Sequence, residues 1–492
     1  MLWLAILAVW VTRKILWVLL YAGHAIAGLT MRQMEFDADR YEARFAGSDA
    51  FERTSRRLQE LGVGMQMAYS QLGSSHREGR LVDDLPALTR INSGKLPDEI
   101  KKELDKAYAE GKTGWFDSHP CDKDRVANAK AEEAQGVVTV DAPATTLFTD
   151  FAAQSKATTW EYYREVFGPQ LKKTSLEPIA KLMESEEKME AADKRLASYY
   201  AGAARAHCAL PLRSGHLTRP ESPKAVAAQL KTARAAVEEA APDAREQLKR
   251  MDKAKGDLVT ALQLESPRKA GFKIGSKAVE ERFQTEEGCR RVRDKARLTI
   301  NQATMKLEGF QQSLADRLFA ACELLLVDQV AEKLSDGGES RRRVEACLPV
   351  LVAIDGQMES LKKLFECEAP LGAVVGALQG QPDDLTINEI DRLVGHAHPA
   401  MTQVREVLIH HDYPFDHKSD GVTMGAFVLP DPIARADLSA VVNAMPEMTD
   451  RLFTVRRRLL GELASVAEKV EALLGLKPLP QPPTEEGEAA AA

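Results

Sequence analysis

Cysteine and aromatic residues are scarce in this 492-residue chain, and each shortage excludes a class of protein. Only six cysteines occur, and no two form a C-x-x-C pair, which excludes a disulfide scaffold and a structural zinc ribbon and fits a reducing compartment. Aromatic residues make up 6% of the chain, whereas Ala, Leu, Glu, Lys and Arg are abundant, a mixture that favours helices over sheets. The formal net charge of −7 argues against general binding to nucleic acid. Composition therefore predicts a mainly α protein with its bulk in the cytoplasm.

The N-terminal segment, residues 1–29, departs from this composition because it is almost wholly apolar, with Arg13 and Lys14 as the interruption. A membrane span needs about 20 apolar residues, and neither half reaches that length alone. Read as one helix, the segment carries two charges that cost about 2.5–3.5 kcal/mol each on an insertion scale. Tryptophans at positions 3, 10 and 17 and Tyr21 are typical of a membrane–water interface. We expect a membrane-associated segment, spanning or interfacial. The alternative is a buried amphipathic helix of a soluble domain.

The sequence that follows predicts a helix ending at about Ala46, because apolar residues recur three or four apart and Gly47 can terminate it. Glu35 and Asp39 lie four residues apart on this helix, and therefore on one face. Two like charges repel at that spacing unless a cation lies beside them. One interpretation is a solvated face on which nearby arginines neutralise both carboxylates: Arg32, Arg40 and Arg44.

A second interpretation rests on the stretch M-E-F-D-A-D-R-Y-E-A, which contains Glu35 and Asp39. It resembles the E-x-x-x-D helix of HtpX-like membrane zinc metallopeptidases, the family that also includes the CAAX prenyl endopeptidases. The resemblance implies that Glu35 is the third zinc ligand and that Asp39 supports the site. A carboxylate one turn from a ligand can accept a hydrogen bond from the free N–H of a histidine ligand and fix its orientation.

Two later segments extend the resemblance in the family's order. The stretch G-W-F-D-S-H-P, which ends with His119 and Pro120, is followed by Arg125 and resembles the family's S/T-H-P motif with an arginine six residues later. Residues 147–168, LFTDFAAQSKATTWEYYREVFG, resemble the end of the peptidase region. The resemblance implies a metallopeptidase-like region over residues 30–170, with Asp39 and His119 as catalytic residues and a protein or peptide as substrate. His119 has an alternative, structural interpretation, in which Pro120 occupies the first turn of a helix.

One departure from the family concerns the metal. No H-E-x-x-H occurs in the 492 residues, although zinc catalysis of this type needs three protein ligands, an open position and a glutamate base. In one explanation, sequence upstream of this chain encodes the motif, and the whole product is a zinc metalloendopeptidase. In the other, the protein is a pseudo-peptidase, a non-catalytic membrane-anchored helical scaffold that binds partner proteins. In both cases we expect the chain as given to hold no stoichiometric zinc and to lack protease activity.

The remaining sequence predicts a long helical domain over residues 171–475. Apolar residues at helical spacing predict long amphipathic helices over 292–325 and 452–474. Ser222-Pro223 is typical of a helix start, and Pro242 is expected to break or restart that helix. Residues 413–428 are the best candidates for a small non-helical element. The histidines between 396 and 417 match no metal-ligand spacing, and the Pro-, Glu- and Ala-rich tail, 476–492, is expected to be disordered.

Overall fold

The computed structural model describes residues 2–138, 140, 142–169, 171–203, 205, 208–213, 215–275, 279–378 and 380–479. The predicted fold class is confirmed, because helices account for nearly all regular structure in this part of the chain. The two short strands found there, β1 (Leu81–Val82) and β2 (Leu176–Glu177), pair in parallel. The chain divides into two compact units, an N-terminal unit (Met1–Met183) and a C-terminal unit (Glu184–Ala492). This division lies 13 residues beyond the predicted one at 170.

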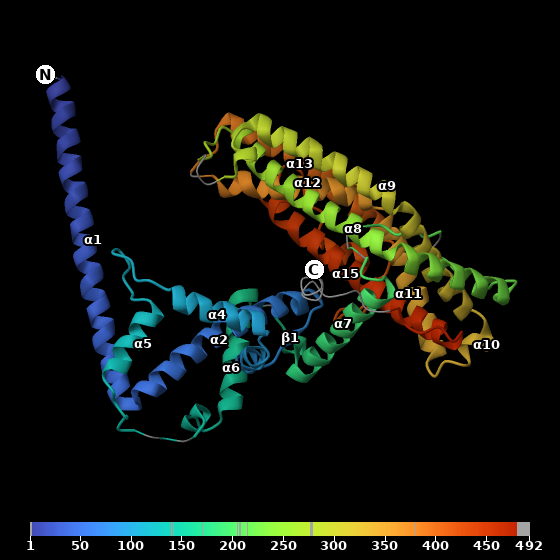
Figure 1. The fold of residues 1–492 in the computed structure, drawn as a ribbon, viewed down its shortest axis with the longest axis horizontal. Coiled ribbons are helices and arrows are strands. Elements are labelled where there is room, and N and C mark those ends of the chain that lie inside the picture. Colours follow the sequence, from blue (N-terminus) through green and yellow to red (C-terminus); the bar gives the residue numbers. More distant parts are fainter. Residues whose placement is uncertain are drawn as a thin grey trace. The chain divides into compact units, whose positions relative to one another are not determined.

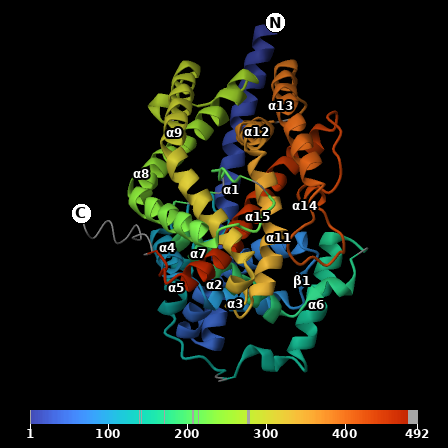
Figure 2. The same cartoon turned by 90° about the vertical axis from the view of Figure 1, so that its right-hand side faces the viewer.

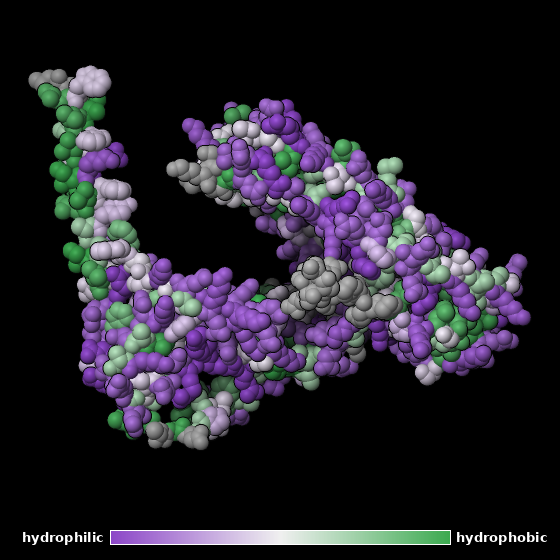
Figure 3. Space-filling model, in the orientation of Figure 1, coloured by the Kyte–Doolittle hydropathy of each residue, from purple (hydrophilic) through white to green (hydrophobic). Residues whose placement is uncertain are grey.

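Helix α1 (Leu2–Ala46) contains the apolar segment and ends at the predicted residue. It is long and apolar enough to cross a membrane, and its most apolar window is not buried at all. Figure 3 shows hydrophobic side chains on the outside of its N-terminal half. That exposure does not fit the alternative of a buried helix in a soluble domain. Lys14 lies between two tryptophans, with its Nζ 5.8 Å from the ring centre of Trp10 and 5.9 Å from that of Trp17.

Further helices complete the N-terminal unit, and of these α2 (Ser48–Arg77) and α5 (Asp122–Ala131) pack directly on the polar end of α1 (Figure 1). The unit also contains α3 (Leu85–Gly94), α4 (Asp98–Glu110) and α6 (Phe151–Phe167). Gly47 turns the chain from α1 into α2 with a φ of 101°, a conformation that L side chains rarely adopt. Gly64 lets α3 approach α2 closely, since a Cβ there would lie 2.6 Å from the carbonyl oxygen of Thr89. A small core of Ala43, Phe51, Val126 and Ala129 joins α1, α2 and α5.

The C-terminal unit is a bundle of long helices around one large core. It contains the greater part of α7 (Ile179–Tyr199), then α8 (Pro223–Lys269), α9 (Glu286–Leu325), α10 (Asp328–Ala331), α11 (Gly337–Asp355), α12 (Met358–Gly376), α13 (Asp384–Leu408), α14 (Met424–Val428) and α15 (Leu438–Leu473). Helices α8 and α9 pack along each other, as Figure 2 shows. Two buried ion pairs, Arg317 with Glu471 and Arg456 with Asp355, connect α9 and α11 to α15.

Several predictions for this unit are confirmed, one is wrong and others hold only in part. The predicted helix over 292–325 lies within α9, the one over 452–474 lies within α15 except for its last residue, and α8 begins at Pro223 as predicted. Pro242 does not break α8; its side chain is exposed, so water can satisfy the carbonyl that loses its helical partner.

Residues 413–423 are non-helical as predicted and are closed by an isolated antiparallel bridge between Asp412 and Thr423. Residues 424–428 instead form α14, because the Thr423 hydroxyl accepts a hydrogen bond from the Ala426 amide and starts a helix. The predicted disordered tail begins too early at 476, because Leu479 is buried in the core and the Lys477 carbonyl accepts a hydrogen bond from Arg234 at 2.7 Å. From residue 480 on, the tail falls outside the described residues.

Candidate functional site

The site predicted from the sequence lies where the polar end of α1 meets α5 and the loop that precedes it, residues 111–121. Arg32 of α1 is buried and holds this loop by its backbone. Its Nη1 donates hydrogen bonds to the carbonyl oxygens of Gly114, at 3.0 Å, and Asp117, at 2.6 Å. The loop backbone lies so close to α1 that a Cβ at Gly28 would be 3.2 Å from the Asp117 carbonyl oxygen.

The loop is also braced from within. The Asp117 carboxylate accepts a hydrogen bond from the Gly114 amide at 2.6 Å. The Thr113 hydroxyl donates to the Asp124 carboxylate at 2.5 Å and accepts from the Cys121 amide at 3.0 Å. These bonds link both ends of the loop to the start of α5. Hydrogen bonds, rather than a hydrophobic core, therefore fix the C-terminal end of the loop relative to α1.

His119, at the end of this loop, contacts Glu35. Its Nδ1 lies within hydrogen-bond distance of the Glu35 Oε1. The imidazole is 70% exposed, whereas the Glu35 carboxylate lies deeper, and its second oxygen, Oε2, is buried without a hydrogen-bond partner. A buried polar atom without a partner is uncommon in folded proteins, and this oxygen is therefore available to a ligand or ion.

Asp39 lies one turn further along α1 and binds Arg125 of α5. The guanidinium donates twice, from Nε at 2.9 Å and from Nη2 at 2.6 Å. The Asp39 side chain is only 2% exposed and that of Arg125 36%, and this hydrogen bonding raises the pKa of Arg125 above its ordinary value. The resemblance led us to expect a histidine as the partner of Asp39. In the structure, Asp39 instead connects α1 to α5.

The solvated-face interpretation of the two acidic residues is wrong. Arg32 binds backbone carbonyls of the loop. Arg40 and Arg44 both donate to Glu132, at 2.7 and 2.8 Å. None of the three arginines neutralises Glu35 or Asp39. The two carboxylates are directed toward the loop and α5, whereas Arg40 and Arg44 lie on a different face of α1.

The structural interpretation of His119 also changes. Pro120 does not occupy the first turn of a helix, since α5 begins at Asp122 with Cys121 as its N-terminal cap residue. The side chain of His119 is directed to Glu35 instead.

The third segment of the resemblance, residues 147–168, forms α6 and packs on α3. The Thr159 hydroxyl accepts a hydrogen bond from the Leu85 amide at 3.0 Å. The Ser155 hydroxyl donates to Asp84, which caps α3. This segment therefore supports the fold of the N-terminal unit and lies away from the pair of Glu35 and His119.

The donor set does not complete a zinc site. Within the described part of the chain, no three His, Cys, Asp or Glu side chains lie close enough together to hold a metal ion. Near α1 the candidates are Glu35 and His119, since Asp39 is occupied by Arg125. In the C-terminal unit, the ring of His398 is held by the carbonyl of Ile433, with 2.7 Å between Nε2 and the oxygen.

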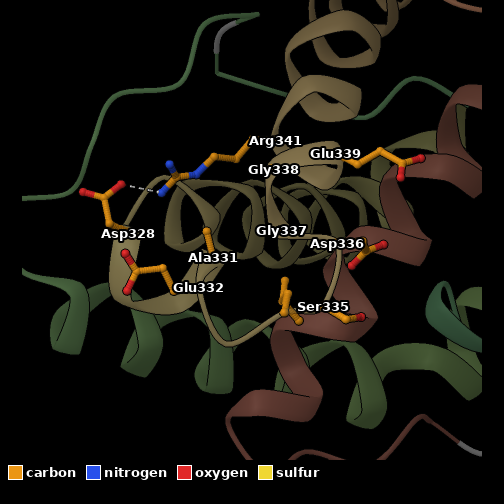
Figure 4. A pocket seen from close by; sticks show the side chains of 10 residues that line it. Asp328, Ala331, Glu332, Ser335, Asp336, Gly337, Gly338, Glu339 and Arg341 are labelled. Carbon is orange, nitrogen blue, oxygen red and sulfur yellow. Dashed lines mark hydrogen bonds and ion pairs between the residues drawn. The ribbon is translucent and has the colours of Figure 1, made fainter.

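A hollow of about 530 Å³ beside α10 and α11 gathers several carboxylates (Figure 4). Asp328 accepts a hydrogen bond from Arg341 at 2.9 Å, and Asp336 accepts one from Lys469. Glu339 is bound by Arg343 at 2.7 Å. Three of the four lining acids are thus neutralised by neighbouring cations, and the fourth, Glu332, is a single carboxylate, which does not make a cation site by itself.

Sequence reasoning missed a feature of the loop, which is that it presents aromatic side chains to solvent beside the apolar half of α1. Trp115 is 79% exposed and Phe116 59%. The Phe116 ring meets Tyr21 edge-on with 5.5 Å between ring centres, and Tyr21 lies 4.0 Å from Trp17. The adjacent W-F pair is a signal in the sequence, but only the structure places it against α1.

Comparison of the chain with protein-family models, with curated proteins and with solved structures finds no match.

Proposed function

We propose that the N-terminal unit is part of a membrane-bound zinc metalloendopeptidase of the HtpX-like type, which hydrolyses peptide bonds in membrane or misfolded proteins. One observation carries the proposal. The residues that the resemblance selects lie on two segments more than 80 residues apart, and they meet in the fold as two pairs, His119 with Glu35 and Arg125 with Asp39. A chance likeness over a short helix gives no reason for the later segment to fold back onto it.

Each residue of this site has a role in the proposal that follows from its contacts. The free, buried Oε2 of Glu35 is the metal ligand. Asp39 and Arg125 hold the helix that carries this ligand in a fixed position, since a bidentate pair restricts both side chains. His119 is exposed and contacts Glu35, so it lies where a bound peptide would pass the site.

The proposal requires ligands that the described part of the chain does not bring to Glu35. Glu35 and His119 provide two donor groups, whereas a catalytic zinc site needs three ligands and a base. The two histidines and the glutamate of an H-E-x-x-H helix would have to come from sequence upstream of Met1.

We also propose that α1 anchors the unit in a membrane, with the rest of the protein on the cytoplasmic side. Residues 2–29 of α1 would span about 40 Å at 1.5 Å per residue, more than the roughly 30 Å of a bilayer core. Trp115 and Phe116 lie beside this segment, and exposed aromatic residues are typical of the membrane interface. Glu35 follows Leu29 by six residues, about 9 Å along the helix. The site would therefore face substrates close to the membrane surface.

Zinc analysis of two purified chains tests the peptidase proposal. If the genomic sequence upstream of Met1 encodes H-E-x-x-H in frame, the extended chain should contain one zinc, and Glu35→Gln should remove the metal or abolish hydrolysis. Asp39→Asn in the same chain should weaken zinc binding by about 10–100-fold. The 492-residue chain should contain no stoichiometric zinc. Full activity of the extended Glu35→Gln chain would contradict the role of Glu35.

A second candidate function is a non-catalytic, membrane-anchored scaffold for partner proteins. It is favoured by the absence of any group of three metal-ligating side chains among the described residues. The N-terminus of the protein isolated from its natural source separates the two candidates. If mass spectrometry places the N-terminus at Met1, the scaffold is favoured. If the N-terminus lies upstream and the added sequence contains H-E-x-x-H, the peptidase is favoured.

A further inference from the structure

The C-terminal unit contains a cavity of about 600 Å³ between α8, α9 and α12. This volume lies in the range of about 300–1,000 Å³ that is typical of small-molecule sites. Most of its wall is apolar, with side chains from all three helices: Met251, Leu258, Ile300, Leu307, Leu361 and Phe365. Such a wall favours a ligand with a hydrocarbon portion, because burying apolar surface is the main favourable contribution to binding there.

Two lysines line the same cavity, Lys255 from α8 and Lys362 from α12. Within the described part of the chain, neither ammonium group has a hydrogen bond or an ion pair. Burial lowers the pKa of Lys255 to about 8; Cys208 and Asp252 oppose this shift, and the nearby charge of Lys362 adds to it. Two cations that repel each other beside an apolar wall are stabilised by an anion placed between them.

The acidic groups near these lysines do not fill that role. Glu366 is bound by Arg297 at the mouth of the cavity, and Asp252 is bound by Arg205 at 3.0 Å. Glu359 also lines the cavity, and it is exposed. The positive charge of Lys255 is therefore not matched inside the cavity by the chain's own carboxylates.

We propose that this cavity binds a single-chain amphiphile with an anionic head group, namely a long-chain fatty acid. Its hydrocarbon chain would lie against the apolar side chains of α8, α9 and α12. Its carboxylate would accept hydrogen bonds from Lys255 and Lys362. This inference concerns the C-terminal unit and does not depend on the function proposed for the N-terminal unit.

The test uses the whole 492-residue chain in detergent and palmitic acid that carries a photoreactive diazirine in its acyl chain. After irradiation, mass spectrometry should find the label on peptides of α8, α9 and α12 that line the cavity. Unlabelled palmitate should compete for this labelling, whereas methyl palmitate, which lacks the negative charge, should not. Labelling of residues 2–29 of α1 gives the reference for non-specific partition of the probe.

Three variants localise the site. Lys255→Met removes the charge and keeps most of the side-chain volume, and it should reduce cavity labelling by about tenfold, the loss of one charged hydrogen bond. Lys253→Met, at an exposed position on the same helix, is the matched control and should change nothing. Thr304→Phe, at an exposed lining position of α9, fills the cavity without removing either lysine and should also prevent labelling.

Different outcomes would overturn the role of the head group and the proposal as a whole. Cavity labelling that methyl palmitate removes as well as palmitate, or that Lys255→Met leaves unchanged, would overturn the role of the anionic head group. Cavity labelling that does not exceed the α1 reference in the wild-type chain would overturn the proposal as a whole. An unchanged circular dichroism spectrum of each variant ensures that a loss of labelling reports on the cavity and not on unfolding.

Discussion

Replacing Arg125 with methionine should destabilise the N-terminal unit by about 3–5 kcal/mol, the usual cost of leaving a buried charge without its partner. The Asp39 side chain is 2% exposed and receives both of its ion-pair hydrogen bonds from Arg125. Removing the carboxylate instead, by Asp39→Asn, should cost less, about 1–3 kcal/mol. The reason is that the guanidinium left behind is 36% exposed and water can solvate it. We therefore expect Arg125→Met to lower the free energy of unfolding more than Asp39→Asn does.

Urea unfolding in detergent, followed by tryptophan fluorescence, measures this effect in the intact chain. All five tryptophans, at positions 3, 10, 17, 115 and 160, lie in the N-terminal unit, so the signal reports on that unit alone. With a slope of about 1–3 kcal/mol per molar urea, Arg125→Met should lower the midpoint by about 1 M or more. The slope itself should stay the same.

Arg40→Met is the matched control, because it removes a guanidinium from the same interface of α1 with α5. Its pair with Glu132 is more exposed, and Arg44 also binds Glu132, so the cost should not exceed about 1 kcal/mol. The double variant of Arg125→Met with Asp39→Asn should be more stable than Arg125→Met alone. Equal midpoints for Arg125→Met and Arg40→Met, or no rescue in the double variant, would refute the reasoning.

Three further predictions concern other parts of the molecule. The stability of the C-terminal unit should rise between about pH 8 and pH 10.5. The pKa of Lys255 is about 8 in the folded state against an ordinary 10.5, so in this interval Lys255 is protonated in the unfolded chain and neutral in the folded one, and raising the pH favours folding. Lys255→Met should remove that rise, and an unchanged profile of thermal midpoints would contradict it. Iodoacetamide should modify the half-buried Cys121 well before Cys322, because burial raises the pKa of the Cys322 thiol to about 12. A reversed order of modification, measured by peptide mass spectrometry, would contradict this. In vesicles with brominated lipids, a variant whose one tryptophan is Trp115 should lose fluorescence, whereas one retaining Trp160 should not.

The sequence alone determined the features that depend on neighbouring residues. Apolar spacing predicted the mainly helical fold and the long helices within α9 and α15, and Gly47 marked the end of α1. These predictions hold because a helix is set by hydrogen bonds and side-chain spacing within a few turns. The apolar segment 1–29 was likewise visible from the sequence, because a long run of apolar residues is recognised from the residues themselves, without knowledge of what they contact.

Only the tertiary structure decided which side chains share the site. The sequence marked Glu35, Asp39, His119 and Arg125, yet it assigned Asp39 a histidine as partner and placed Pro120 in a helix. In the structure Arg125 binds Asp39, and His119 reaches Glu35 because Arg32 holds the loop against α1. These pairings join residues more than 80 positions apart, and they depend on how α5 and the loop pack on α1. Local spacing contains no information about that packing, because it is set by the non-local hydrogen bonds and burial that form only when the chain folds.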